Sequence, residues 1–158
     1  MGKKIDWHKE ADVYNTAGMH EDAVSCYNHA IEENPSDDIA WVRKGFTLFI
    51  LNKNEDAFLC YEKAVEINPK NIDALENKGV HLLGIDRDLE ALECFDRVLR
   101  LNDKNPCTWF NRGMALKKQC KYWESLNSFN KGLELYSGDE DAERCADELM
   151  KKLINLGG

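Results

Sequence analysis

The stretch EDAVSCYNHAIEENP at residues 21–35 returns as EDAFLCYEKAVEINP at residues 55–69, a step of 34 residues. Two further copies follow at the same step, LEALECFDRVLRLND from Leu89 and WESLNSFNKGLELYS from Trp123. The segment before each copy repeats as well: WHKEADVY, WVRKGFTL, LENKGVHL and WFNRGMAL start at Trp7, Trp41, Leu75 and Trp109. Agreement at so many positions in one phase establishes an internal repeat.

Each half of the repeating unit has the residue spacing of an α-helix. In the first half of the second repeat, Trp41, Gly45 and Leu48 share one helical face. In its second half, one face is formed by Ala57, Tyr61, Ala64 and Val65. Asn105 followed by Pro106 has the form of a helix N-cap and first turn. No alternating run rich in Val, Ile or Thr predicts a strand. The sequence therefore predicts an all-α fold in which each unit is a helix, a tight turn and an antiparallel helix.

These units resemble the tetratricopeptide repeat, in which small residues let paired helices approach and aromatic residues fill the gap between them. Gly45 and Ala57 are such small residues here, and Trp41 and Tyr61 are such aromatics. The resemblance implies a right-handed α-solenoid of nine helices in one structural domain. Its predicted parts are four repeats and a capping helix, at residues 4–37, 38–71, 72–105, 106–139 and 140–156. The chain departs from the family pattern where Pro is replaced by Asp103 and Ser137, and Ala by Gly132.

The segment after the fourth repeat has one apolar stripe, formed by Ala142, Cys145, Ala146, Leu149, Leu153 and Leu156. Charged residues lie opposite this stripe, with acids at the start of the segment and Lys151 and Lys152 near its end. We expect a half-buried helix that covers the last open face of the repeat stack. The alternative is that the stripe mediates dimerisation.

Composition excludes several classes of protein. The 158 residues carry 21 Lys and Arg against 29 Asp and Glu, a net charge of −8, which disfavours binding to a nucleic-acid backbone. No uncharged stretch approaches the roughly 20 residues of a membrane span, and none resembles a secretory signal. These features predict a cytoplasmic protein with no nucleic-acid or membrane partner.

No motif for catalysis, metal binding or a cofactor is found. The four His form no HExxH pair, and no glycine-rich phosphate loop is present. Cys26, Cys60 and Cys94 recur at one repeat position, where equivalent atoms should lie about 10 Å apart, too far for a disulfide. We therefore interpret them as small apolar core residues. The expectation is a protein that is not an enzyme and needs no metal or cofactor.

In the tetratricopeptide family the first helix of each unit lines a concave groove that holds a peptide or a helix. From this resemblance we predict groove residues at Lys9, Val42, Arg43, Phe46, Phe49, Asn77, Val80, Leu83, Phe110, Asn111, Met114 and Lys117. Phe46 and Met114 are the strongest candidates, because exposed apolar patches mark interaction sites. Two alternatives stay open: the polar members form a solvated column, and several apolar members pack as ordinary core.

Many family members bind the C-terminal carboxylate of a chaperone through a clamp of Lys, Asn and Arg. The matching positions here are His8, Asp12, Arg43, Asp73 and Asn77, and none agrees. We therefore predict that this chain has no such clamp.

Charge is unevenly distributed, with eight acids against two bases in residues 4–37 and a locally basic fourth repeat. This pattern favours a ligand with an apolar middle and an acidic end near the fourth repeat. The predicted function is a scaffold that binds an extended or amphipathic helical segment of a partner protein. The alternative is a self-associating module, joined through the groove or through the last helix.

Overall fold

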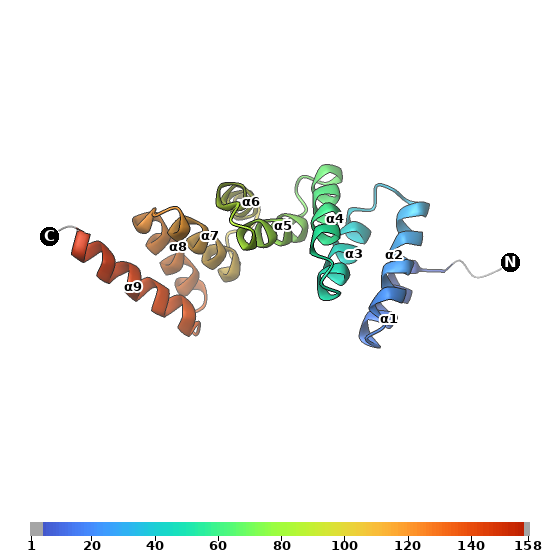
Figure 1. Ribbon diagram of the computed structural model, residues 1–158, viewed down its shortest axis with the longest axis horizontal. Helices are drawn as coiled ribbons and strands as arrows, with labels where there is room; N and C mark the ends of the chain where they lie inside the picture. The colour runs from blue at the N-terminus through green and yellow to red at the C-terminus, as the bar shows by residue number, and fades with distance from the viewer. Residues whose placement is uncertain (1–4, 157–158) are drawn as a thin grey trace. The chain divides into compact units, whose positions relative to one another are not determined.

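The computed structural model describes residues 5–156 of the chain, and these residues form nine α-helices and no strand (Figure 1). The all-α prediction is confirmed. In chain order the helices are α1 (Trp7–Thr16), α2 (His20–Glu33), α3 (Asp38–Ile50), α4 (Asn54–Ile67), α5 (Ile72–Gly84), α6 (Asp88–Leu101), α7 (Pro106–Lys118), α8 (Tyr122–Leu135) and α9 (Glu140–Leu156).

The helices belong to two compact units, residues 1–77 and 78–158, and each unit is described by itself. Unit 1 contains α1 to α4 and the first part of α5, and unit 2 contains the rest of α5 and α6 to α9. Within the units α1 packs on α2, α3 on α4 and α7 on α8 as helix pairs. The grouping of four repeats and a cap into one domain stays a prediction, and its first residue, Lys4, lies outside the described residues.

Helices α3, α5, α7 and α9 each begin at a side-chain cap that recurs every 34 residues. The side-chain oxygen of each cap accepts a hydrogen bond of 2.8–3.0 Å from a backbone N–H in the first turn, and this satisfies a donor that the helix leaves unpaired. The residues that do so are Asp37, Asn71, Asn105 and Asp139. The expected pairing of Asn105 as cap with Pro106 in the first turn is confirmed.

The turn inside each helix pair also follows the 34-residue step. One residue there has a positive φ, between 57° and 76°, at Gly18, Asn52, Asp86 and Cys120. The following backbone N–H then bonds back across the turn, as from Lys53 to the carbonyl of Leu48 at 2.9 Å. Gly, Asn and Asp tolerate this left-handed conformation, so three of the four turns have suitable residues and Cys120 is the exception.

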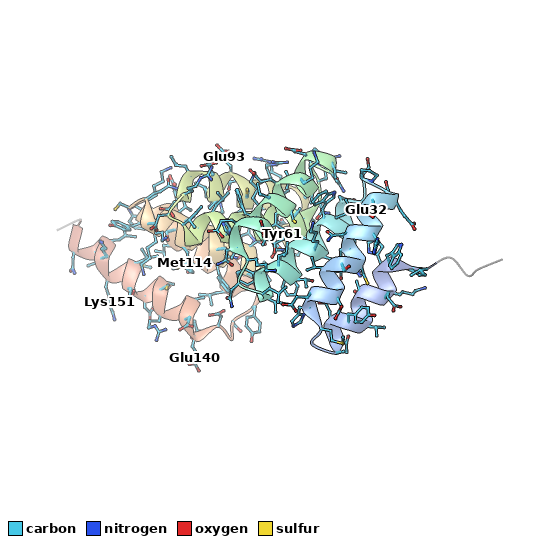
Figure 2. All side chains as sticks on the ribbon, turned by 45° about the vertical axis from the view of Figure 1, so that its right-hand side comes forward. Glu32, Tyr61, Glu93, Met114, Glu140 and Lys151 are labelled. Atoms are coloured by element: carbon cyan, nitrogen blue, oxygen red, sulfur yellow. The ribbon has the colours of Figure 1, made fainter. Side chains whose placement is uncertain are left out.

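The core within each pair is a buried aromatic ring packed against a small residue. Tyr27, Tyr61, Phe95 and Phe129 are at most 3% exposed. A Cβ added to Gly45 would lie 2.7 Å from Cε1 of Tyr61, and one added to Gly79 would lie 2.7 Å from Cε1 of Phe95. Tyr61 can be found among the helices of unit 1 in Figure 2. The predicted role of the small residues, close approach of paired helices, is confirmed.

We expect Gly45→Ala to lower the free energy of unfolding by about 1–2 kcal/mol, because overpacking costs roughly 1–3 kcal/mol and outweighs the gain in helix propensity. Besides the Tyr61 ring, the new methyl would meet the backbone carbonyl of Ala57 at 3.1 Å, which cannot move aside cheaply. Urea unfolding followed by circular dichroism measures the change. Gly84→Ala is the control, because a Cβ there meets nothing within 4 Å. Equal effects of the two substitutions would show that the Gly45 contact is not tight.

The last helix, α9, spans residues 140–156 as predicted and packs against α8. Its buried side is formed by Ala142, Ala146, Leu149 and Leu153, and Cys145 packs against the same cluster. Leu126 and Phe129 of α8 lie opposite them in this cluster. Glu140 and Lys151 project from the outer side of α9 (Figure 2). The helix therefore covers the apolar side of α8; the side chain of Leu156, predicted for the same stripe, lies outside the described residues.

Candidate functional site

A pocket of about 350 Å³ lies in unit 1 among α1, α3 and the first part of α5, the first helices of their pairs, which we call the inner helices. It is lined from α1, α3 and the start of α5, together with one residue of α2, by Asp12, Asn15, Tyr27, Val42, Arg43, Phe46, Asp73 and Asn77. We call it the inner pocket. It brings together four of the predicted groove residues, namely Val42, Arg43, Phe46 and Asn77. Its size is at the lower end of ligand sites, enough for one or two side chains.

One wall of the inner pocket is a charged pair. Nη1 of Arg43 donates to both carboxylate oxygens of Asp12, at 2.9 Å each. The two side chains are 43% and 56% exposed, so the pair adds less than about 1 kcal/mol to stability. Its effect on the pocket is electrostatic, because the Asp12 carboxylate neutralises the Arg43 guanidinium.

A hydrogen-bond network fixes the floor of the pocket behind this pair. The Asn15 amide donates to the hydroxyls of Tyr27, at 3.3 Å, and Thr47, at 3.2 Å. The Thr47 hydroxyl in turn lies 2.9 Å from the carbonyl oxygen of Arg43. The network joins α1, α2 and α3, and the burial of Tyr27 raises the pKa of its phenol, which keeps the hydroxyl protonated.

The apolar part of the pocket is formed by α3. Phe46 is 51% exposed, whereas Val42 is 8% exposed and packs with Ala64 and Ala74 in a core cluster. Phe49, three residues after Phe46, is also exposed but does not line the pocket. Phe46 is therefore the apolar side chain of the pocket that is free to contact a partner.

The remaining predicted groove residues are placed differently. Lys9 is highly exposed, pairs with Asp6 at 3.1 Å and does not line the inner pocket. In unit 2, Val80 and Met114 are exposed, while Leu83 and Asn111 are half-buried. None of these four unit 2 residues lines a pocket described here.

Two predicted groove residues of unit 2, Phe110 and Lys117, contact neighbouring helices of that unit. The Phe110 ring stacks on Phe129 at 6.3 Å and occupies the room that Gly132 leaves, so it is partly buried, and its place in the groove stays a prediction. Gly132 stands where the family has Ala, and the missing methyl makes way for this ring. Lys117 pairs with Glu148 of α9 at 3.1 Å, so its ammonium group contacts the last helix.

The predicted groove list lacks four residues of the inner pocket: Asp12, Asn15, Tyr27 and Asp73. Tyr27 belongs to the repeated aromatic column, which indicates core, and only its hydroxyl reaches the pocket. Asn15 occupies the same repeat position as Phe49, Leu83 and Lys117, so the repeat alignment identifies its position but not its hydrogen bonds. Asp73 stands at a position where the sequence departs from the chaperone clamp, and this departure gives no signal of a pocket.

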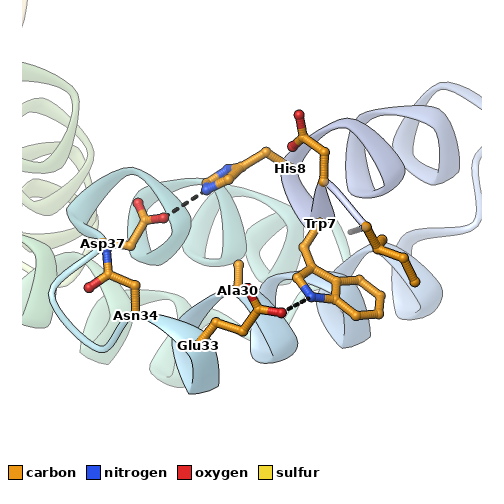
Figure 3. A pocket seen from close by; sticks show the side chains of 8 residues that line it. Trp7, His8, Ala30, Glu33, Asn34 and Asp37 are labelled. Carbon is orange, nitrogen blue, oxygen red and sulfur yellow. Dashed lines mark hydrogen bonds and ion pairs between the residues drawn. The ribbon is translucent and has the colours of Figure 1, made fainter. Parts of the chain in front are cut away.

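A second pocket, of about 330 Å³, lies where α1 begins and α2 ends (Figure 3). The indole of Trp7 donates to Glu33 at 3.0 Å, and a ring nitrogen of His8 lies 2.8 Å from Asp37. Asp37 is also the N-cap of α3. These polar groups already partner one another, and they fasten α1 to the end of α2 and the start of α3.

The cysteines behave as packing residues. Cys26, Cys60 and Cys94 are free thiols, 4–6% exposed. Burial raises the pKa of each, that of Cys60 to about 11, so the thiols stay protonated and unreactive near neutral pH. Cys107 and Cys120 are exposed.

Two other features are absent from the described part of the chain. No three His, Cys, Asp or Glu side chains there gather so as to hold a metal ion. None of the helices there is both long and apolar enough to span a membrane.

Comparison with known families gives two matches. Models of the tetratricopeptide repeat match residues 7–37 and 39–71. A comparison with curated proteins found no match.

Solved structures share the architecture. The crystal structure of MamA has a TM-score of 0.84 at 16% identity and covers 96% of this chain and 86% of its own. YrrB, described as a TPR protein with an unusual peptide-binding site, has a TM-score of 0.85 at 24% identity, covering 97% and 79%. The TPR domain of Arabidopsis OM64 has a TM-score of 0.69 at 20% identity, covering 72% and 94%. At these identities the likeness shows the fold, an all-α helical solenoid.

Proposed function

Because this chain is a tetratricopeptide-repeat protein, we propose that it is a non-catalytic scaffold that holds a segment of another protein against the inner helices of unit 1. The segment is extended or an amphipathic helix, and it contacts Phe46 and the polar rim of the inner pocket. A cytoplasmic location and the absence of nucleic-acid and membrane partners are part of the same proposal.

The observation that carries this proposal is the exposure of Phe46 beside a polar pocket on the inner helices. An aromatic side chain left 51% exposed next to fixed hydrogen-bonding groups is typical of an interface anchor. YrrB, which shares the fold, has a peptide-binding site, and this supports peptide binding here by analogy.

Phe46→Asp is expected to weaken capture of the natural partner by about thirtyfold or more, because an aromatic anchor contributes about 2 kcal/mol or more to binding. Capture by the immobilised full chain, with a quantitative mass-spectrometric readout, identifies the partner and measures the loss. The matched control is Leu59→Asp, since Leu59 is a 60% exposed apolar residue of α4 outside the pocket. Partner capture that Phe46→Asp leaves intact, with helicity unchanged, would contradict the proposal.

A second candidate function is self-association through α9. Met150 and Ile154 lie four residues apart on its outer side and are 43% and 67% exposed. Two such helices could bury these residues against each other. Sedimentation across a concentration series separates the candidates, because a receptor for peptides alone stays monomeric.

A further inference from the structure

The inner pocket has unused hydrogen-bond acceptors and an aromatic face. Asp73 is exposed at its rim, and no residue in the described part of the chain donates to its carboxylate. The Asn77 amide nitrogen donates to the backbone oxygen of Asp73 at 2.8 Å, which leaves the Asn77 side-chain oxygen as an acceptor. Phe46 lines the same pocket.

The cation of the pocket is already neutralised. Both carboxylate oxygens of Asp12 accept from Arg43, so an anion that approached the guanidinium would also meet the charges of Asp12 and Asp73. A positive group meets the opposite situation, since it can pair with Asp73, donate a hydrogen bond to the Asn77 side-chain oxygen and lie against the Phe46 ring. The pocket therefore favours a cation over an anion.

The charge of the whole unit points the same way. Residues 1–77 contain 15 Asp and Glu against 8 Lys and Arg, a net charge of −7, whereas residues 78–158 contain 14 against 13, a net charge of −1. Almost all of the net negative charge therefore belongs to the unit that holds the pocket. Such a field raises the association rate of a positive segment and disfavours acidic ones.

We propose that the inner pocket binds a Lys or Arg side chain of the partner segment, with an adjacent apolar residue of that segment against Phe46. This inference rests on the proposed function and specifies its ligand: a basic and apolar peptide. The cation pairs with Asp73 and Asn77, and the Arg43–Asp12 pair stays intact. Two of the five positions that match the chaperone clamp carry an acid in this chain, Asp12 and Asp73. The pocket therefore prefers a cation, whereas the clamp prefers a carboxylate.

The test begins with selection of random dodecapeptides, displayed on phage, on the immobilised full chain. We expect the enriched peptides to carry Lys or Arg next to an apolar residue and to bind more weakly as salt rises. Enrichment of acidic peptides, or of peptides with no charge preference, would overturn the inference. A selection that enriches nothing would count against the proposed function itself.

A double-mutant cycle on one enriched peptide then assigns the contact. Asp73→Asn is expected to weaken binding about threefold to tenfold, the range for an exposed or partly desolvated charge pair, but to leave unchanged the binding of the same peptide with its cation replaced by Gln. The control Asp56→Asn changes the same charge in the first turn of α4, outside the pocket. Absence of coupling between Asp73 and the peptide cation overturns the inference.

The same peptide distinguishes the two levels of the proposal. If Phe46→Asp abolishes binding but Asp73 shows no coupling, the inner pocket is the binding site and only the assignment of the cation fails. If Phe46→Asp leaves binding unchanged, the proposed function fails as well. Circular dichroism of each variant checks that the helices are intact.

Discussion

Replacing Phe95 by alanine is expected to lower the free energy of unfolding by about 3–5 kcal/mol. Phe95 has no exposed surface and is among the largest side chains buried so completely. Its ring packs against the backbone of Gly79, where even an added methyl would lie 2.7 Å from Cε1. Removing the ring therefore opens a cavity between α5 and α6 that the surrounding side chains cannot fill.

Such a loss is a large part of the total stability of a domain, commonly 5–15 kcal/mol. Urea unfolding followed by circular dichroism measures it. Phe46→Ala removes the same atoms from a ring that is 51% exposed, and we expect a change within about 0.5 kcal/mol. Similar losses for the two variants would contradict the assignment of Phe95 to the core.

Gly79→Ala tests the same contact from the other side. By itself it should be destabilising, because the new methyl overlaps the Phe95 ring. In the Phe95→Ala background the ring is absent and the methyl has room, so the cost should largely disappear. This non-additivity identifies the contact, since two independent sites would give additive effects.

The fold could be predicted from the sequence because each determinant is local and recurs. Asp37, Asn71, Asn105 and Asp139 each cap a helix with their own side chain, and the aromatic column meets the small-residue column within a single helix pair. A repeat of 34 residues presents the same local pattern several times, so one departure does not alter the fold. Cys120 shows this, because it takes the left-handed turn conformation that Gly, Asn and Asp take elsewhere.

The candidate site could be predicted only in part, because it depends on contacts between helices of different repeats. The family resemblance predicts that Arg43 and Phe46 line the groove, but it carries no information that Arg43 pairs with Asp12, 31 residues earlier. The packing of Phe110 could not be predicted for a related reason. Phe110 occupies the repeat position of Val42, but Gly132 on the neighbouring helix makes room for its ring. The replacement of Ala by Gly132 in one helix therefore changes the packing of a side chain in another.

Leu149→Asp is expected to detach α9 from the rest of unit 2. Leu149 is 1% exposed and packs in the cluster that contains Leu126 and Phe129 of α8. Loss of the buried leucine costs about 2–5 kcal/mol, and a buried carboxylate without a partner adds to that cost. The cheaper outcome for the chain is to release the helix and let the new charge reach water.

Release of α9 has two measurable consequences. The helical signal of its 17 residues should fall, and the uncovered surface of Leu126 and Phe129 should bind a hydrophobic dye and promote association at higher concentration. Circular dichroism, dye fluorescence and light scattering follow these changes. The ion pair between Lys117 and Glu148 cannot hold the helix by itself, because it is partly exposed and adds little stability.

Ile154→Asp is the matched control for this prediction. It places the same carboxylate on the same helix at a residue that is 67% exposed, so α9 should stay in place and the helical signal should not change. If Ile154→Asp detached α9 while Leu149→Asp did not, the buried and exposed sides of the helix would be assigned the wrong way round. If neither substitution had an effect, α9 would not be needed to cover α8, and its role as a cap would be lost.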